Sequence, residues 1–285
     1  MSSAIKLPFK QINGSGIPTI FLHGFLGSHK NFTRMTRDIN KQLGLTTLAL
    51  DLRNHGSTIK TPTQMNYSLM ALDLQNFIKE QNLQKVNLIG YSMGAKIAML
   101  VNLGNPNLVQ NLVCLDNAPI VNDIGPDFPR YIEAMKQFNH WAHDVLEKSN
   151  IDIREREWKL MGIRHMKHLV QDDAMALYLF DNFIYDKAQK TIESKVPLDY
   201  IDSNWFKMLG SWPEQSLDKQ INNRVLFIKA ADSQYINKEA EAKIQSIFPN
   251  HGDKIVNVIS GGHDEVLVSH YKTTLELITN FLSEK

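Results

Sequence analysis

The sequence predicts a doubly wound α/β fold built on a mostly parallel sheet. Short, nearly continuous apolar runs recur along the chain and end at a glycine, an aspartate or a histidine. Such runs suit strands that are buried on both faces of a parallel sheet. Segments with apolar residues three and four positions apart lie between the runs, as in helices packed on a sheet. Because strands and helices alternate, the predicted fold class is α/β.

The first half of the chain supplies four predicted strands and two helices. The strands are residues 17–22, 45–50, 86–89 and 112–115. A first helix face combines Leu69, Leu72, Phe77 and Ile78 in a segment opened by Ser68, and a second combines Ile97, Leu100, Val101 and Leu103. Right-handed crossovers bring most carboxyl ends of the strands to one edge of the sheet, where functional sites collect.

A helical insertion interrupts this alternation. The strand signals stop near residue 120, and helical spacing follows at Ile132, Met135, Phe138, Ala142 and Val145, then at Leu169, Leu177 and Phe180. We therefore predict a helical cap at residues 120–223, inserted into a core of residues 1–119 and 224–285. After the cap we expect strands at 225–228 and 255–259 and helices at 239–248 and 266–282.

Composition and charge exclude several classes of protein. Lys plus Arg number 31 against 30 Asp plus Glu, so a net charge of +1 gives no case for nucleic acid or an anionic membrane. Cys114 is the single cysteine, so no internal disulfide can form. We expect its side chain to be buried in the core and not to act as a nucleophile. No apolar run approaches the roughly 18 residues of a membrane span. We expect an intracellular protein, cytosolic or with a trimmed start.

A serine between a predicted strand and a predicted helix is the centre of the expected chemistry. Residues 90–94 (GYSMG) match the G-x-S-x-G pattern, in which Ser92 occupies a strained turn and the positions two residues away must be small. The backbone N–H of Met93 would then point to the same space as the serine oxygen. The alternative is a structural turn flanked by glycines.

A serine nucleophile needs a base and an acid. His263 follows the last predicted strand and is the expected base, whereas His23 lies beside the predicted oxyanion loop and His55 reads as loop structure. Asp116 and Asp232 compete for the acid, since each ends a predicted strand. Topology alone slightly favours Asp232, the more usual position.

An oxyanion hole needs two donors. We expect the N–H groups of Met93 and Phe25, the latter because a glycine before it lets the backbone come close. Two pairs of histidines, His140/His143 and His165/His168, are three residues apart on predicted helices, a spacing that could supply half of the ligands of a metal site. Solvated helix faces are the favoured interpretation, so no metal is expected. Lys96 is likewise expected on a solvated face.

Four short motifs together resemble the α/β-hydrolase superfamily over residues 17–282: residues 23–25 (HGF), 51–57 (DLRNHGS), 90–94 (GYSMG) and 262–263 (GH). Residues 51–57 and 92–96 (SMGAK) resemble more narrowly a small-esterase subfamily that includes the bacterial YbfF esterase, a mitochondrial abhydrolase group and the yeast ethanol acetyltransferases. In that subfamily the acid follows the strand directly after the nucleophile helix. The resemblance therefore favours Asp116 over Asp232, and it implies a mitochondrial location.

The resemblance implies acyl-ester or acyl-thioester chemistry through an acyl-serine, with no cofactor. Tyr91 and Ala95 favour an alcohol O-acetyltransferase, which makes ethyl acetate from acetyl-CoA and ethanol and has esterase and thioesterase side activity. A plain carboxylesterase or thioesterase is the alternative. A non-catalytic binding protein on the same fold is a third hypothesis. The expected partners are a small acyl ester, an acyl-CoA or a short alcohol, held in an apolar pocket walled by the aromatic insertion.

Overall fold

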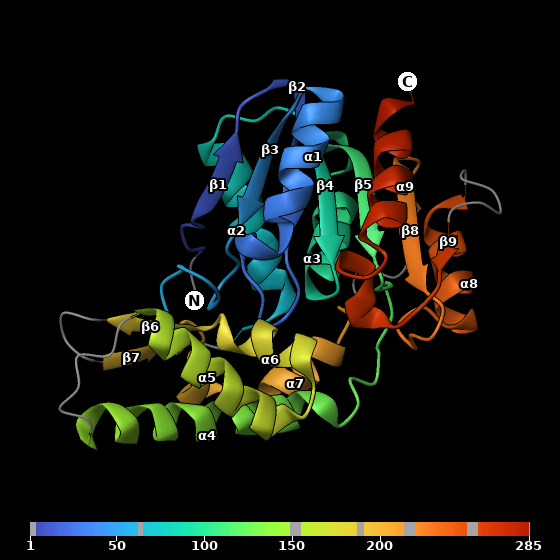
Figure 1. The fold of residues 1–285 in the computed structure, drawn as a ribbon. Helices are drawn as coiled ribbons and strands as arrows, with labels where there is room; N and C mark the ends of the chain where they lie inside the picture. Colours follow the sequence, from blue (N-terminus) through green and yellow to red (C-terminus); the bar gives the residue numbers. More distant parts are fainter. Residues whose placement is uncertain are drawn as a thin grey trace.

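A computed structural model describes residues 4–61, 65–148, 155–186, 191–213, 220–249 and 256–284. In this part of the chain, seven strands form one sheet in the order β1-β3-β2-β4-β5-β8-β9 (Figure 1). Every pairing is parallel except that of β1 with β3. The strands are β1 Phe9–Ile12, β2 Ser15–Leu22, β3 Leu45–Leu50, β4 Val86–Tyr91, β5 Val109–Leu115, β8 Arg224–Ala230 and β9 Val256–Ile259. The predicted mostly parallel α/β sheet is confirmed.

Helices cover both faces of this sheet, and each face has its own apolar core. On one face pack α2 Tyr67–Glu80, α3 Met93–Gly104 and α8 Lys238–Ile247. On the other pack α1 Thr33–Leu43 and α9 Tyr271–Ser283. Strand β4 serves both cores, since Leu88 faces the first and the next residue, Ile89, faces the second. This alternation is what the continuous apolar run of a doubly covered strand requires.

Several local expectations differ from the structure. Strand β1 and helix α1 have no counterpart in the prediction. The strand was missed because it is a half-exposed edge strand without a continuous apolar run. Helix α2 is capped by Asn66, whose side chain accepts from the Leu69 N–H, and not by Ser68. A 3-10 turn at His263–Leu267 precedes α9, so the last helix begins at Tyr271. Ile255, predicted to open the last strand, lies outside the described residues.

The segment between β5 and β8 forms a separate layer beyond the carboxyl ends of the parallel strands (Figure 1). It contains α4 Asp127–Lys148, α5 Glu155–Val170, α6 Asp173–Phe180 and α7 Ser203–Gly210. It also contains an antiparallel pair, β6 Phe183–Asp186 and β7 Thr191–Ser194, so the expectation that this segment has no strands was wrong. Each of these strands has only four residues, too few for a clear alternating pattern. Among the described helices none has the length and apolarity that crossing a bilayer requires.

Candidate active site

Ser92 lies on the tight turn between β4 and α3. Its φ of 52° falls in the left-handed region, which costs a non-glycine residue about 1–3 kcal/mol. The Ser92 N–H donates to the carbonyl of Leu115 on β5 at 2.9 Å. A Cβ added at Gly94 would lie 2.2 Å from the Leu22 carbonyl oxygen, and one at Gly90 would lie 2.3 Å from that of Gly94. Side chains at either position would therefore prevent this turn.

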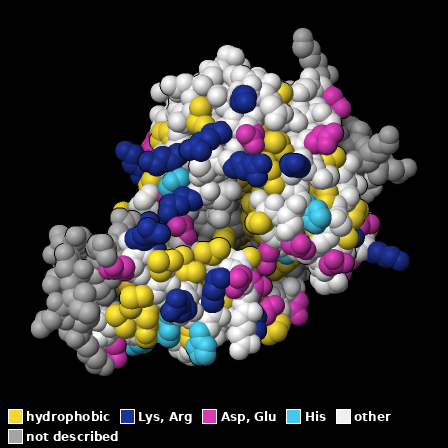
Figure 2. Space-filling view, viewed as in Figure 1, with side chains coloured by type: hydrophobic (Ala, Val, Ile, Leu, Met, Phe, Trp, Pro, Cys, Tyr) yellow, Lys and Arg dark blue, Asp and Glu magenta, His cyan; other side chains and the backbone are white. Residues whose placement is uncertain are grey.

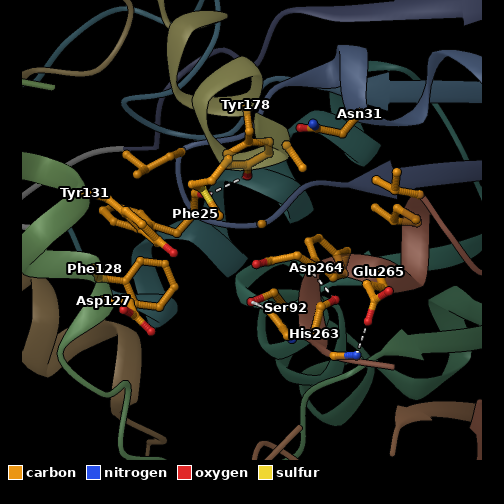
Figure 3. Close-up of a pocket in the computed structure, with 18 of the residues that line it drawn as sticks. Phe25, Asn31, Ser92, Asp127, Phe128, Tyr131, Tyr178, His263, Asp264 and Glu265 are labelled. Carbon is orange, nitrogen blue, oxygen red and sulfur yellow. Dashed lines mark hydrogen bonds between the residues drawn. The ribbon is translucent and has the colours of Figure 1, made fainter. Parts of the chain in front are cut away.

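His263, which lies beside Ser92 in Figure 3, stands between Ser92 and Asp116. Its Nε2 lies 3.0 Å from the Ser92 Oγ, and its Nδ1 lies 2.7 Å from an Asp116 carboxylate oxygen. The ring of Tyr91 stacks on the imidazole at 5.0 Å between centroids, and the Tyr91 hydroxyl donates to the His263 carbonyl at 3.1 Å. These contacts hold the imidazole in one orientation between a hydroxyl and a carboxylate.

Asp116, and not Asp232, fills the position next to the histidine. Asp116 is completely buried, and its other carboxylate oxygen accepts from the Ala230 N–H at 3.0 Å. Strand β5 lies between β4 and β8 in the sheet, so its carboxyl end comes directly beside Ser92. Asp232 is exposed on the loop after β8, where its backbone N–H donates to Gly261. The structure therefore brings Ser92, Asp116 and His263 together and leaves Asp232 outside this group.

The loop after β2 passes directly next to Ser92. A Cβ added at Gly24 would lie 3.3 Å from the Ser92 Cβ. The Gly24 carbonyl oxygen accepts from the Gly27 N–H at 3.1 Å and contacts the His23 Nδ1 at 2.7 Å. In a trans peptide the N–H of Phe25 points in the direction opposite to the Gly24 carbonyl, because both groups belong to the same peptide plane. Met93 is the first residue of α3, so its N–H has no acceptor within the helix.

A buried polar scaffold supports this loop. His23 is fully buried, and its Nε2 accepts from the Leu52 N–H at 3.0 Å, so Nδ1 carries the proton. Burial lowers the pKa of His23 to about 4 and that of His55 to about 3, which keeps both rings neutral near pH 7. Asp51 is buried too, which alone would raise its pKa, but hydrogen bonds from His29 and Ser57 lower it to about 2.

A cavity of about 510 Å³ opens above the serine, and the surface is hollowed where the sheet meets the α4–α7 layer (Figure 2). Ser92 and His263 lie in its wall together with the aromatic rings of Phe25, Phe128 and Tyr178 (Figure 3). Four carboxylate side chains also line it, and none of the described lining residues is Lys or Arg: Asp127, Asp172, Asp264 and Glu265. Such a cavity disfavours anionic groups.

Several lining residues were not anticipated from the sequence. Phe128 and Tyr178 belong to the segment between β5 and β8, whose approach to the sheet no local pattern encodes. Asp264 follows His263 directly, so its place in the sequence was a usable signal. Burial raises the pKa of Asp264, as do the nearby Asp172 and Asp127 carboxylates, while His263 and a Tyr91 hydrogen bond lower it.

Two other expectations concern Lys96 and the histidine pairs. Lys96 is fully buried, so its expected solvated position was wrong: α3 is enclosed by the sheet, by α2 and by the end of α7. His165 stacks on Trp141 at 4.0 Å, whereas His140 is exposed. Within the described ranges no three His, Cys, Asp or Glu side chains are grouped as metal ligands. Cys114 is buried, as expected.

A mostly parallel sheet with a strained serine between a strand and a helix is the architecture of the α/β-hydrolases. The chain belongs to the α/β-hydrolase fold family, whose family model matches residues 18–270. It is an enzyme of this family.

The chain is similar to curated proteins and to solved structures of this family. The chain is 32% identical to a probable alcohol acetyltransferase of Wickerhamomyces anomalus over 94% of this chain and 79% of the relative. It is 34% identical to ethanol acetyltransferase 1 of Cyberlindnera jadinii over 84% of this chain and 73% of that protein. Among solved structures, a marine microorganism esterase matches with a TM-score of 0.81 and 27% identity, over 98% of this chain and all of the other.

Proposed function

We propose that Ser92 is the nucleophile of an acyl-transfer reaction, with His263 as its general base and Asp116 as the acid that orients the base. The observation that carries this proposal is the continuous hydrogen-bonded series from the Ser92 Oγ through His263 to the buried Asp116. A serine, a base and an orienting acid in this geometry form an activated nucleophile. The N–H groups of Phe25 and Met93 form the oxyanion hole.

Acylation follows from this geometry. The Ser92 Oγ attacks the carbonyl carbon of an ester or thioester while His263 Nε2 takes the hydroxyl proton. Asp116 stabilises the resulting imidazolium through Nδ1. The negative oxygen of the tetrahedral intermediate accepts from the Phe25 and Met93 N–H groups. When the intermediate collapses, the bond to the leaving group breaks, and His263 returns the proton to the departing thiol or alcohol.

Deacylation repeats these steps with a second nucleophile. His263 takes a proton from an alcohol or from water, the new oxygen attacks the acyl-serine, and Ser92 leaves with the proton. An alcohol yields a new ester, whereas water yields a carboxylic acid. Both outcomes use the same residues, so the balance depends on how well the cavity holds an alcohol and excludes water.

The substrate preference rests on the relatives and on the cavity. Two of the relatives are named alcohol or ethanol acetyltransferases, which supports an alcohol O-acetyltransferase that makes ethyl acetate from acetyl-CoA and ethanol. The segment 120–223 serves as a cap that encloses the acyl group and the alcohol, since Phe128 and Tyr178 line the cavity. The phosphates of CoA would lie outside the cavity, because carboxylates line it.

The test is a product assay with purified protein and acetyl-CoA, with and without ethanol, in which free CoA, acetate and ethyl acetate are measured. Ethyl acetate that rises with ethanol and disappears in Ser92→Ala supports the acetyltransferase. Free CoA and ester in equal amounts would show that the acetyl group reaches the alcohol. Release of CoA that is independent of Ser92 contradicts the proposal.

A plain carboxylesterase or thioesterase is the second candidate, and the likeness to the marine esterase over the whole chain favours it. Acetate as the only product, or turnover of simple esters alone, would identify this activity. A non-catalytic binding protein is separated by a fluorophosphonate probe, which labels an activated Ser92 and leaves an inactive one unlabelled. The mitochondrial location stays a prediction, to be tested by fractionating cells that express the full-length protein.

A further inference from the structure

Helix α6 of the cap contacts the loop that carries the Phe25 N–H. The Tyr178 hydroxyl donates to the carbonyl oxygen of Phe25 at 2.7 Å, a bond drawn in Figure 3. Asn182, two residues beyond the end of α6, donates from its side-chain amide to the carbonyl oxygen of Leu26 at 2.9 Å. Two side chains from the cap thus hold two successive carbonyls of the core.

The neighbouring carbonyl is held from the other side. The Gly24 oxygen accepts from the Gly27 N–H and contacts the His23 side chain. The carbonyls of Gly24, Phe25 and Leu26 are therefore all hydrogen-bonded, which fixes three successive peptide planes. The Phe25 N–H belongs to the first of these planes, so its direction depends on the φ and ψ angles that these contacts maintain.

This loop needs such support. Leu26 has a φ of 60°, in the left-handed region that costs a residue with a side chain about 1–2 kcal/mol. A strained conformation persists only where the surroundings determine it. Gly27 is tightly enclosed as well, since a Cβ there would lie 3.0 Å from the Tyr178 hydroxyl oxygen. The cap therefore packs against the loop at the point where the backbone is least relaxed.

The buried contact of Asn182 and the partly buried contact of Tyr178 contribute more than the ion pair nearby. Asn182 is only 3% exposed, and burial raises the pKa of Tyr178 well above its ordinary value, so its hydroxyl remains a donor. Lys30 also pairs with Asp181 at 2.7 Å, but both side chains are about half exposed. Exposed pairs of this kind contribute little.

We propose that Tyr178, together with Asn182, is a positioning residue that sets the direction of the Phe25 N–H. The oxyanion hole is then complete only while α6 is seated on the loop, and the cap takes part in transition-state stabilisation as well as in enclosing the substrate. This inference rests on the function proposed above.

The test is Tyr178→Phe, which removes one oxygen atom and keeps the ring that lines the cavity. Loss of a whole oxyanion donor costs about 10²- to 10³-fold in kcat, so a misdirected donor should cost about 10- to 100-fold. We expect that loss in kcat for p-nitrophenyl acetate, with KM within about twofold of the native value. The inhibition constant of a trifluoromethyl ketone, whose adduct carries the oxyanion, should rise by the same factor as kcat/KM falls.

Tyr200→Phe is the matched control, because Tyr200 is a half-exposed tyrosine of the same cap segment. It should leave kcat, KM and the inhibition constant unchanged. Asn182→Ala gives a second test. It removes the bonds from the Asn182 amide to the carbonyls of Leu26, at 2.9 Å, and Tyr178, at 3.3 Å, but keeps the bond from the Tyr178 hydroxyl to Phe25. It should lower kcat in the same pattern. Thermal unfolding of each variant shows that the comparison is made between folded proteins.

A native kcat in both Tyr178→Phe and Asn182→Ala would overturn the inference, and so would a change confined to KM. A lower kcat with an unchanged inhibition constant would also contradict it, because the oxyanion hole would then be intact. Failure of the proposed function looks different. In that case Ser92→Ala would keep the activity of the native protein, whatever the outcome for Tyr178.

Discussion

The side-chain amine of Lys96 donates to the carbonyl oxygen of Ser211 at 2.9 Å and to that of Gly210 at 3.1 Å. Lys96 lies on α3, the helix that follows Ser92, and both carbonyls lie at the end of α7, in the layer beyond the sheet. The Tyr67 hydroxyl of α2 donates to the preceding carbonyl, that of Leu209, at 2.9 Å. The carboxyl end of α7 is thus held by donors from α2 and α3, which joins the α4–α7 layer to the helix that positions the serine.

Replacing Lys96 by methionine should destabilise the fold. The change keeps an unbranched side chain but leaves the Gly210 and Ser211 carbonyls without their donor, and an unsatisfied buried acceptor costs about 1–3 kcal/mol. We expect the free energy of unfolding to fall by about 2–3 kcal/mol in urea titrations at pH 10, where deprotonating Lys96 costs the folded protein less than about 1 kcal/mol. Lys207→Met changes an exposed lysine of α7 and should alter stability by less than about 0.5 kcal/mol. Equal stabilities of the two variants would contradict the assigned role.

Lys96 should also make stability depend on pH above neutrality. Burial lowers its pKa to about 7 from the ordinary value of 10.5. Between these values the unfolded chain binds a proton that the folded protein does not, so the stability of the native protein relative to Lys96→Met rises with pH. The slope should approach about 1.4 kcal/mol per pH unit. Urea titrations of both proteins at pH 7, 8 and 9 measure it, and a constant difference would argue against a neutral buried amine.

The two buried histidines, His23 and His55, should make the folded protein less stable in acid. The folded pKa values of His23 and His55 are about 4 and about 3, below the ordinary 6.5. Their contribution is fully present above pH 6.5 and is lost as the pH falls toward the folded values, because the unfolded chain takes up both protons first. The two sites together should give a slope of up to about 2.7 kcal/mol per pH unit.

The measurement is urea unfolding between pH 6.5 and 4.5. His55→Gln should reduce the slope by about half, since one of the two protons is removed. His140→Gln, at an exposed position, should leave it unchanged. A slope that is the same in all three proteins would mean that other groups cause the acid sensitivity.

Asp116→Asn and Asp232→Asn form a matched pair that tests the choice of the acid. The Asp116 substitution keeps the shape of the side chain, but an amide cannot stabilise the His263 imidazolium. We expect kcat for p-nitrophenyl acetate to fall about 10³- to 10⁴-fold. Asp232 lies on the exposed side of its loop, so Asp232→Asn should keep kcat near the native value. The reverse result would assign the acid to Asp232.

Local sequence signals were enough to place some residues and not others. Ser92 and His263 were located because each follows a strand and carries its own glycine pattern. The choice between Asp116 and Asp232 depended on which strand lies next to β4, and strand order is a property of the whole sheet. Lys96 and Tyr178 could not be placed, because their contacts join segments that are 114 and 153 residues apart. The β6–β7 pair was missed because four-residue strands leave little pattern.

The serine turn itself gives the last prediction. At Gly94 a Cβ would lie 2.2 Å from the Leu22 carbonyl oxygen and 2.7 Å from that of His23, and a backbone that belongs to a central strand cannot move aside. Gly94→Ala should therefore reduce stability by about 3 kcal/mol. It should also displace β2 and the oxyanion loop from Ser92, so that fluorophosphonate labelling slows even in molecules that remain folded.

Gly104→Ala, at the end of the same helix, is the control, because its Cβ would meet only the flexible tip of Gln75 at 3.4 Å. It should change stability by less than about 1 kcal/mol and keep native labelling. Native labelling in Gly94→Ala would show that the turn tolerates a side chain and that the close approach of β2 does not determine the reactivity of Ser92.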